Sequence, residues 1–400
     1  MFKQEIPIPR MIKAMPDYQA RKLIRGAKAN PMRHYCPNGM QEDVIVLIHS
    51  VAGKDTNIPT LLVTYANGTG KCLPLNSPVL MQDGNWRELG KIVPGDRVIG
   101  HDYNGTGIAS PCNVVATSRA GLKDVYKVRF KDGGEVYTSL DHHFPVKVRS
   151  GRDSYVHKRK MEDLIRYKQN YTGGAIKFQS PKTIEYTPND SALPIDPYLL
   201  GVLIGDGSIV ACVKFTTISP EILNRVKKIV EDGTYIVKHI DRNDYIITNG
   251  IGRRENKYTK ELRGLGLFGL KSGFKYIPDI YLKASIQDRI QLLSGLIDTD
   301  GSLAEYSSKS RRLAINFVAL VKSLGGYATI AEKIINNEFT KGKDKLFYRV
   351  YWRMDYDLPL ELGYKQKVSK RPIEYSNRFV KDIIYVGKME CGDIQVDHPS

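Results

Sequence analysis

From about residue 72 to about residue 180, short apolar runs alternate with turn signals along the chain. Most of the runs are β-branched, and dipeptides such as Asp83-Gly84 and Pro94-Gly95 stand next to them. The runs lie at 79–81, 97–99, 114–116, 125–128 and 136–137. Short strands joined by tight turns give this pattern, so the sequence predicts an all-β segment here.

A polar, proline-rich connection over 179–197 leads to a different pattern, in which one motif occurs twice. Residues 199–208 read Leu-Leu-Gly-Val-Leu-Ile-Gly-Asp-Gly-Ser, and residues 293–302 read Leu-Ser-Gly-Leu-Ile-Asp-Thr-Asp-Gly-Ser. Each copy precedes a short strand, an amphipathic helix and two β-rich runs. The helices are expected over 220–229 and 311–324, and the β-rich runs over 235–247 and 327–352. We therefore predict an internal duplication, after which β-type runs return at 378–380 and 383–386.

The 400 residues carry a formal net charge of +17. A basic excess of this size attracts polyanions, so DNA or RNA is the expected partner, with a solvated lysine-rich surface as the plainer alternative. The length suggests about two to four domains. Apolar stretches stay far below the roughly 20 residues of a membrane helix, and the N-terminus has no secretory signal. We therefore expect no membrane partner and a cytoplasmic location.

Residues 60–65 read as a strand that runs into a glycine-rich turn ending at Lys71. In a phosphate-binding loop the glycines, here Gly68 and Gly70, let backbone N–H groups surround phosphate oxygens, and the lysine reaches the β- and γ-phosphates. The next residue is Cys72, where such a loop has Ser or Thr, and prolines two and six residues later prevent the helix that should follow. A simple glycine-rich turn explains these residues equally well.

Three motifs in this order resemble a phage terminase large subunit interrupted by an intein that carries a LAGLIDADG homing endonuclease. The strand and loop ending at Lys71 resemble a terminase ATPase motif without its final Ser or Thr. The opening Cys-Leu-Pro-Leu-Asn-Ser-Pro-Val-Leu-Met from Cys72 resembles an intein N-terminus, and the motifs around Gly201 and Gly295 resemble the paired endonuclease motif. The resemblance implies a mainly β plus α+β chain: an all-β Hint-type fold with an inserted two-repeat endonuclease domain, preceded by a short α/β ATPase fragment.

The resemblance also divides the chain into four parts. They are a host fragment over 1–71, the first part of the splicing domain over 72–180, the endonuclease over 195–372 with repeats over about 197–280 and 285–372, and an incomplete last part of the splicing domain over 373–400. The family continues to a terminal His-Asn, which this sequence does not contain. We therefore expect full splicing to be incomplete in this chain.

Cys72 is the expected nucleophile of processing. Its thiolate can attack the Lys71 carbonyl and turn that peptide bond into a thioester, provided that an acid serves the departing nitrogen and a donor serves the oxyanion. Inteins use a Thr-x-x-His motif for this. Here Ser139-Leu-Asp-His142 matches it, with serine in place of threonine.

Neighbouring residues leave alternatives open at this site. Thr138 lies one residue out of register and offers a second hydroxyl, and His143 is a second histidine. Near the end of the chain, Asp393 lies in a segment that resembles the last strand of an intein. It either tunes proton transfer there or is a solvated turn residue.

The duplicated motif has its own physical logic. Gly201 and Gly295 allow two helices to approach closely, and Asp206 and Asp300 then meet at a pseudo-twofold axis. Like charges this close repel one another unless divalent cations lie between them, so both aspartates are expected to bind Mg²⁺ and each to serve one DNA strand. Two ordinary helix ends with Asp before Gly are the plain alternative. Lys275 resembles the lysine of an intein endonuclease motif and is a further catalytic candidate.

The sequence thus predicts a self-splicing chain that is also a Mg²⁺-dependent double-strand DNA endonuclease. Splicing needs no cofactor, and ATP with Mg²⁺ is expected only in the spliced host. Double-stranded DNA is the predicted partner, contacted by basic and aromatic residues at 242–245, 253–254, 257 and 341–352. Two repeats in one chain predict a monomer. The alternatives are a DNA-binding module with a decayed nuclease and an unspliced ATPase fragment. The resemblance places the protein in a bacterial host cell as a phage or prophage product.

Overall fold

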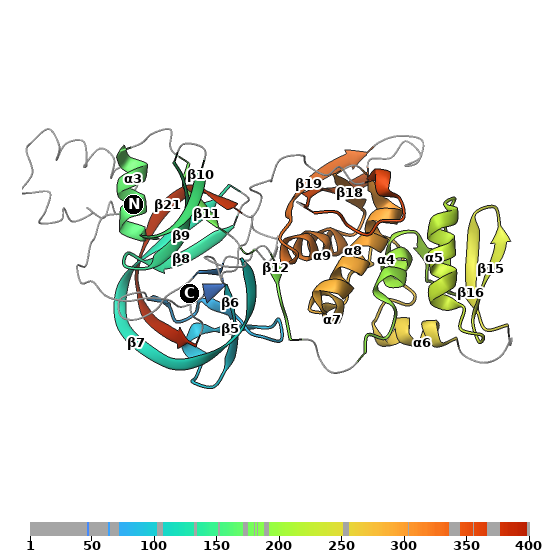
Figure 1. The fold of residues 1–400 in the computed structure, drawn as a ribbon, viewed down its shortest axis with the longest axis horizontal. Coiled ribbons are helices and arrows are strands. Elements are labelled where there is room, and N and C mark those ends of the chain that lie inside the picture. Colours follow the sequence, from blue (N-terminus) through green and yellow to red (C-terminus); the bar gives the residue numbers. More distant parts are fainter. Residues whose placement is uncertain are drawn as a thin grey trace, which may run out of the picture. The chain divides into compact units, whose positions relative to one another are not determined.

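The computed structural model describes residues 46–47, 63–64, 72–101, 107–131, 134–150, 153–170, 175–179, 181, 183–187, 192–250, 256–302, 304–335, 345–354, 356–365 and 377–397. Contacts divide the chain into two units, one of residues 1–181 with 376–400 and one of residues 182–375 (Figure 1). The first unit is mainly β-sheet, and the second combines helices with two small sheets. The four-part domain assignment stays a prediction.

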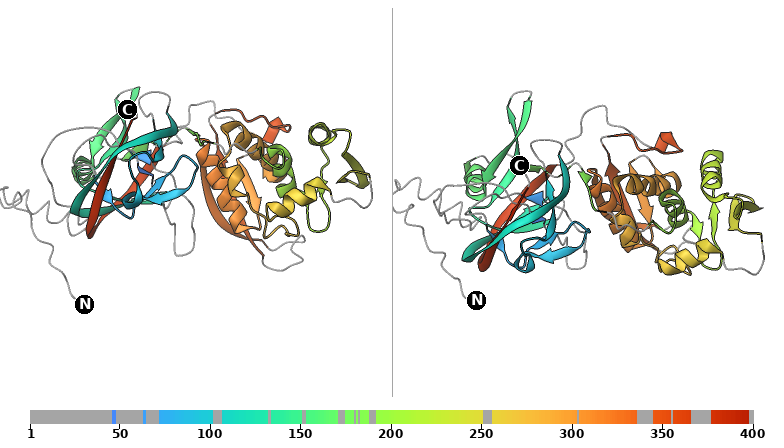
Figure 2. Two further views of the ribbon diagram at one scale, coloured as in Figure 1. Left: turned by 90° about the horizontal axis from the view of Figure 1, so that it is seen from below. Right: turned by 60° about the horizontal axis from the view of Figure 1, so that its bottom comes forward.

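Two long antiparallel strands, β7 (Ile108–Phe130) and β21 (Asn377–Val396), form the centre of the first unit. They pair along most of their lengths, and four register shifts interrupt the ladder. Such bulges bend a strand and increase its twist, which lets both strands curve around the core (Figure 1). Figure 2 shows the same pair crossing the unit from two further directions.

Shorter strands complete the first unit. β9 and β11 continue the sheet beside β21, β3 pairs with β21, and β6 and β8 pair with β7. Their bounds are β1 (Val46–Leu47), β2 (Val63–Thr64), β3 (Leu73–Pro74), β4 (Pro78–Leu80), β5 (Trp86–Glu88), the 3-10 helix η1 (Leu89–Lys91), β6 (Arg97–His101), β8 (Glu135–Ser139), β9 (His143–Ser150), β10 (Asp153–Lys160) and β11 (Lys177–Gln179).

One helix corrects the prediction that residues 72–180 are all-β. α3 covers Met161–Asn170, and Met161, Leu164 and Ile165 are buried on one side of it. This spacing of three and four residues is helical, and acidic residues in its first turn and Lys168 in its last turn match the helix dipole. The sequence pattern did not reveal this short helix, because it has few apolar positions and lies between segments with strand patterns.

The second unit is built from two similar halves. The first half contains a sheet in the order β13-β14-β16-β15, and the second contains one in the order β17-β18-β20-β19. The elements are β12 (Thr183–Ile184), α4 (Pro197–Gly205), β13 (Gly207–Ser208), β14 (Lys214–Thr216), α5 (Pro220–Val230), β15 (Ile236–Asp241), β16 (Asp244–Thr248), α6 (Lys257–Gly264), α7 (Asp279–Leu282), α8 (Ile286–Asp300), β17 (Gly301–Ser302), β18 (Glu305–Ser308), α9 (Arg311–Ser323), β19 (Tyr327–Ile335), β20 (Lys345–Arg353) and the 3-10 helix η3 (Gly363–Lys365). Among the described residues, no helix is long and apolar enough to cross a membrane.

Helices α4 and α8 pack backbone to backbone at the centre of this unit (Figure 1). α4 begins where the Asp196 carboxylate caps the Leu199 N–H at 3.0 Å and Pro197 fixes the first turn. The Cα of Gly201 lies so close to Gly295 that a Cβ on Gly295 would be 3.1 Å from it. The glycines therefore set the approach of the two helix ends.

Replacing Gly295 with alanine should destabilise the second unit by about 2–3 kcal/mol, because the new methyl group would meet the backbone of α4. Urea unfolding followed by Trp352 fluorescence, with Trp86→Phe as background, measures the change. Gly264→Ala is the matched control, since nothing lies within 4 Å of its added Cβ and alanine favours a helix by up to about 1 kcal/mol. Equal midpoints for both variants would contradict the tight packing.

Candidate functional site

Cys72 lies directly before β3, and its peptide is held by Ser139 at the end of β8. The Cys72 carbonyl accepts hydrogen bonds from the Ser139 N–H at 3.2 Å and from its hydroxyl at 2.5 Å. The Cys72 side chain is buried in a cluster with Val125 and Cys391. A strand end, a turn and the paired strand β21 therefore fix the thiol.

The surroundings of Cys72 keep its thiol protonated at neutral pH. Burial, with the nearby charges of Asp141 and Asp393, raises the pKa of this thiol to about 12. The cause is electrostatic, because neither an apolar cluster nor carboxylates can stabilise a thiolate. A reaction at Cys72 therefore needs a base that removes the proton as the sulfur attacks.

Asp141 is a residue of this centre that the sequence reasoning missed, although it lies inside the Ser139–His142 motif. Its carboxylate shares the single proton of the Ser139 hydroxyl with the Cys72 carbonyl and lies 3.9 Å from the Lys123 ammonium. Burial raises the pKa of Asp141, against the lowering effects of Ser139 and Lys123. A carboxylate that holds its proton more tightly than usual is a better base. The only available signal was its place between the two motif residues.

The other predicted residues of this centre differ in their contacts. Thr138 is buried and donates to the Ser139 carbonyl at 3.2 Å, so Ser139 is the hydroxyl bonded to the Cys72 peptide. His142 is fully buried with its ring edge-to-face on Phe144, at 4.9 Å between centroids. His143 begins β9, with its backbone paired to β10.

Asp393 is on β21, one residue after Gly392, which pairs with Leu73. That register brings Asp393 to the strand end where Cys72 lies, and its charge acts on the thiol. Gly68, Gly70 and Lys71, the predicted nucleotide-binding residues, lie outside the described residues, as do 253–254 and 341–344 of the predicted DNA contacts.

A second centre lies where α4 and α8 end. Asp206 is the residue that caps α4, and Asp300 is the last residue of α8. Burial raises the pKa of both carboxyl groups, and the charge of Asp206 helps to raise that of Asp300 to about 6. The two carboxylates are therefore close enough to repel each other.

Two lysines face this carboxylate pair, one from each half. Lys275 is buried, and its ammonium donates to the carbonyls of Leu203, Ile204 and Gly207 at 2.7–3.0 Å. Burial lowers its pKa to about 8, although Asp300 and Asp206 oppose the shift. Lys365 occupies the corresponding place on α8, and sequence reasoning missed it because no motif surrounds it.

The donor set of this centre fits Mg²⁺. Asp206 and Asp300 supply buried carboxylates whose repulsion a divalent cation would relieve, and Mg²⁺ commonly binds one or two carboxylates together with waters and phosphate oxygens. The described residues contain no group of three or more His, Cys, Asp or Glu side chains that could hold a metal. Waters or phosphate oxygens would complete the shell.

Comparison with known proteins gives two kinds of similarity. The replicative DNA helicase DnaB of Mycobacterium intracellulare is 27% identical over 368 residues, which cover 85% of this chain and 58% of the relative. The replicative DNA helicase DnaB of Nostoc sp. is 24% identical over 260 residues, 60% of this chain and 27% of the relative. This chain thus spans little more than half of the first relative and about a quarter of the second.

Two solved structures that resemble part of this chain are inteins. A G-1F mutant of the Ssp DnaB mini-intein variant M86 matches 30% of this chain and 67% of its own, at 12% identity and a TM-score of 0.23. The Msm DnaB1 intein splicing domain bound with zinc matches 22% of this chain and 78% of its own, at 21% identity and a TM-score of 0.17. No protein-family profile matches the chain.

These relatives overturn the host assignment. They are replicative DNA helicases, so the identification of a terminase is wrong, and the phage origin that rests on it falls with it. A strand followed by a glycine-rich loop and a lysine is common to many ATPases, so residues 60–71 could not separate one host from another. None of these names mentions a LAGLIDADG endonuclease, so the relatives do not support that family assignment.

Proposed function

We propose that this chain is a self-processing protein, an intein that forms a thioester at the Lys71–Cys72 bond. The observation that carries the proposal is the pair of hydrogen bonds from Ser139 to the Cys72 carbonyl, next to the buried Cys72 thiol and the Asp141 carboxylate. Two hydrogen bonds to the Cys72 carbonyl fix the residue whose nitrogen must leave, as an acyl shift requires.

The chemistry follows from the positions of these groups. The Cys72 sulfur attacks the Lys71 carbonyl carbon, a C–S bond forms and the C–N bond breaks. The thiol proton must reach the departing nitrogen, and Asp141 can accept it because burial raises the pKa of this carboxyl. The step adds and removes no atom, so it needs no cofactor. His142 stays the predicted acid for the nitrogen.

The relatives support a helicase-type host for this intein. The similarity to DnaB extends over most of this chain, and Lys71 ends a loop of the kind that binds nucleotide phosphates. We infer that the intein interrupts this loop, so Gly68, Gly70 and Lys71 bind ATP with Mg²⁺ only after splicing restores a helix behind them.

Mass spectrometry of the purified chain tests the proposal. Added hydroxylamine should cleave the thioester and release a fragment that ends at Lys71. Appending a His-Asn tail and host residues should then permit splicing. Failure of both the cleavage and the extended chain's splicing would refute the intein assignment.

The second unit supports a second function, cleavage of double-stranded DNA. The observation that favours it is the meeting of Asp206 and Asp300 at the ends of two packed helices, with Lys275 and Lys365 beside them. Two carboxylates with two cations at a pseudo-twofold axis suit two phosphate groups on opposite strands. The net charge of +17 suits the same polyanion.

At this centre Asp206 and Asp300 would hold Mg²⁺, which when bound supplies an activated water and charge stabilisation at the phosphate. The protein's own contribution is to orient the DNA backbone. Lys275 and Lys365 place positive charge where the leaving oxygen gains negative charge. A monomer in which each aspartate serves one strand would cut both strands without a partner.

Incubating the chain with Mg²⁺ and a supercoiled plasmid that carries the uninterrupted host gene tests this function. Linear plasmid is expected, and EDTA should prevent it. Binding without cleavage would favour a decayed nuclease, and neither binding nor cleavage would refute the proposed DNA partner.

A further inference from the structure

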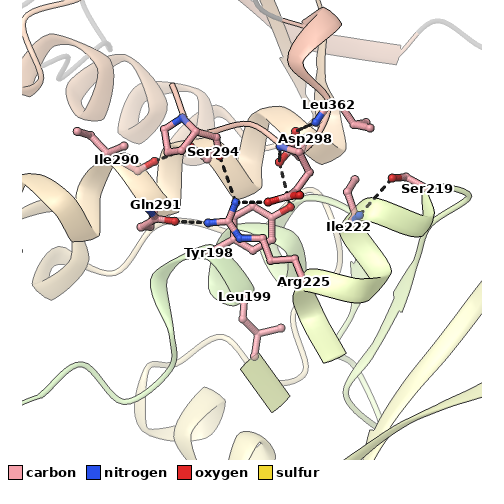
Figure 3. Close-up of polar contacts among 12 residues, drawn as sticks. Tyr198, Leu199, Ser219, Ile222, Arg225, Ile290, Gln291, Ser294, Asp298 and Leu362 are labelled. Carbon is pink, nitrogen blue, oxygen red and sulfur yellow. Dashed lines mark hydrogen bonds and ion pairs between the residues drawn. The ribbon is translucent and has the colours of Figure 1, made fainter. Parts of the chain in front are cut away.

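Asp298 is buried on α8, two residues before Asp300, and is 1% exposed. Its carboxylate accepts hydrogen bonds from the Tyr198 hydroxyl at 2.9 Å and from the backbone N–H groups of Glu361 and Leu362, both at 3.0 Å. Figure 3 shows Tyr198 and Leu362 on either side of this carboxylate. Three donors satisfy a buried charge that would otherwise be costly.

The segment that Asp298 holds ends at Lys365. The Lys365 ammonium donates to the carbonyls of Ile297, Asp298 and Thr299 at 3.2, 2.6 and 2.9 Å. These carbonyls lie in the last turn of α8, where that of Ile297 also accepts the Gly301 N–H. Asp298 therefore binds the 361–365 segment at both ends, through its carboxylate and through its own carbonyl.

Arg225 of α5, in the first half, holds the same segment from the other side. Its guanidinium donates to the Pro359 carbonyl at 3.1 Å and pairs with Glu361 at 2.8 Å. It is also bonded to Gln291 and stacks 3.6 Å from the centre of the Tyr198 ring (Figure 3). The segment is thus fixed by both halves of the unit.

The first half holds Lys275 by other means. Ile204 occupies the position equivalent to Asp298, three residues after the paired glycine, and its side chain cannot accept a hydrogen bond. Instead, Ser310 donates to the Lys275 carbonyl at 2.6 Å, and Asn316 accepts from the Ile277 N–H at 3.2 Å. Lys275 and Lys365 are therefore held in place by different contacts.

We propose that Asp298 is a positioning residue for the carboxylate pair of Asp206 and Asp300. It fixes the 361–365 segment so that the Lys365 ammonium stays at the end of α8, beside both carboxylates. This inference rests on the proposed DNA cleavage and deepens it. Cleavage of one strand depends on a lysine that Asp298 holds in place, whereas Ile204, at the equivalent position, cannot hold Lys275 in this way.

The test uses the full chain with Asp298→Asn, and Tyr198→Phe as the matched control. Tyr198→Phe removes the donor of Asp298 that lies outside the 361–365 segment and keeps the ring under Arg225. With the host-gene plasmid and end-labelled strands, Asp298→Asn should slow cleavage of one strand by about 10–100-fold and leave the other within about twofold. Nicked plasmid should accumulate for Asp298→Asn and not for Tyr198→Phe.

A second measurement does not depend on cleavage. Pulsed acetylation followed by mass spectrometry should label Lys365 several-fold faster in Asp298→Asn than in the parent chain, while Lys275 is unchanged. If the parent chain cuts no DNA, the nuclease proposal fails and this labelling still decides the positioning role. If Asp298→Asn does not fold, Arg225→Lys takes its place. It keeps the positive charge but loses the paired donors of the guanidinium, so it should speed Lys365 labelling and slow one strand by a smaller factor. Equal slowing of both strands, or unchanged Lys365 labelling, would overturn the inference.

Discussion

Replacing both Asp206 and Asp300 with asparagine should abolish cleavage of the host-gene plasmid, with at least about a 100-fold loss for each strand. Asparagine keeps the shape of each side chain and removes the charge that would hold Mg²⁺. If each aspartate serves mainly one strand, each single variant should leave nicked plasmid, since the remaining aspartate still cleaves its strand. Strand-specific rates from end-labelled DNA measure both effects.

Binding should persist in these variants, because they remove negative charge from a surface that meets phosphate groups. Asp279→Asn is the matched control, since that carboxylate is exposed on α7 and pairs with Lys283. It should cleave at the parent rate. Undiminished nuclease activity in the double variant would show that the carboxylate pair is not the active centre.

The second large effect concerns Cys72. Cys72→Ala should remove all hydroxylamine-dependent release of the fragment ending at Lys71, because the thioester forms only through the Cys72 sulfur. In the parent chain, release should rise with pH as Asp141 loses its proton and then level off, because the ionised carboxylate takes the thiol proton during the attack.

Cys212→Ala is the control for thiol chemistry, since this half-buried cysteine lies in the second unit. It should release fragment at the parent rate and with the same pH dependence. Asp141→Asn should slow release by about 100-fold if Asp141 takes the thiol proton. Fragment release from Cys72→Ala would contradict the assigned nucleophile.

The paired helices could be predicted from sequence because their constraints are local and strong. Glycine at 201 and 295, apolar neighbours and Asp-Gly at the end leave few alternatives for the backbone. The long strand β7 could not be predicted, because Gly121 and the polar residues before it look like a turn between two short strands. In the structure β21 pairs across this stretch and a bulge absorbs the irregular residues.

The site residues divide in the same way. Cys72, Ser139 and His142 stand in a recognisable motif, and the structure describes where each lies without testing its role. Asp141 and Lys365 carry no such signal, because their positions depend on a fold that brings distant segments together. Lys365 could be recognised as part of the site only once the fold placed its ammonium next to the carbonyls of α8.

The pairing of β11 with β21 joins Phe178 to Arg378, although roughly 200 residues lie between them. Closing a loop of that length costs about 3.5 kcal/mol more than closing a four-residue hairpin, which slows any nucleus that needs this contact. A second unit that folds first makes the connection compact and lowers this entropic cost. The order in which the parts fold therefore sets how soon the cysteine centre can form.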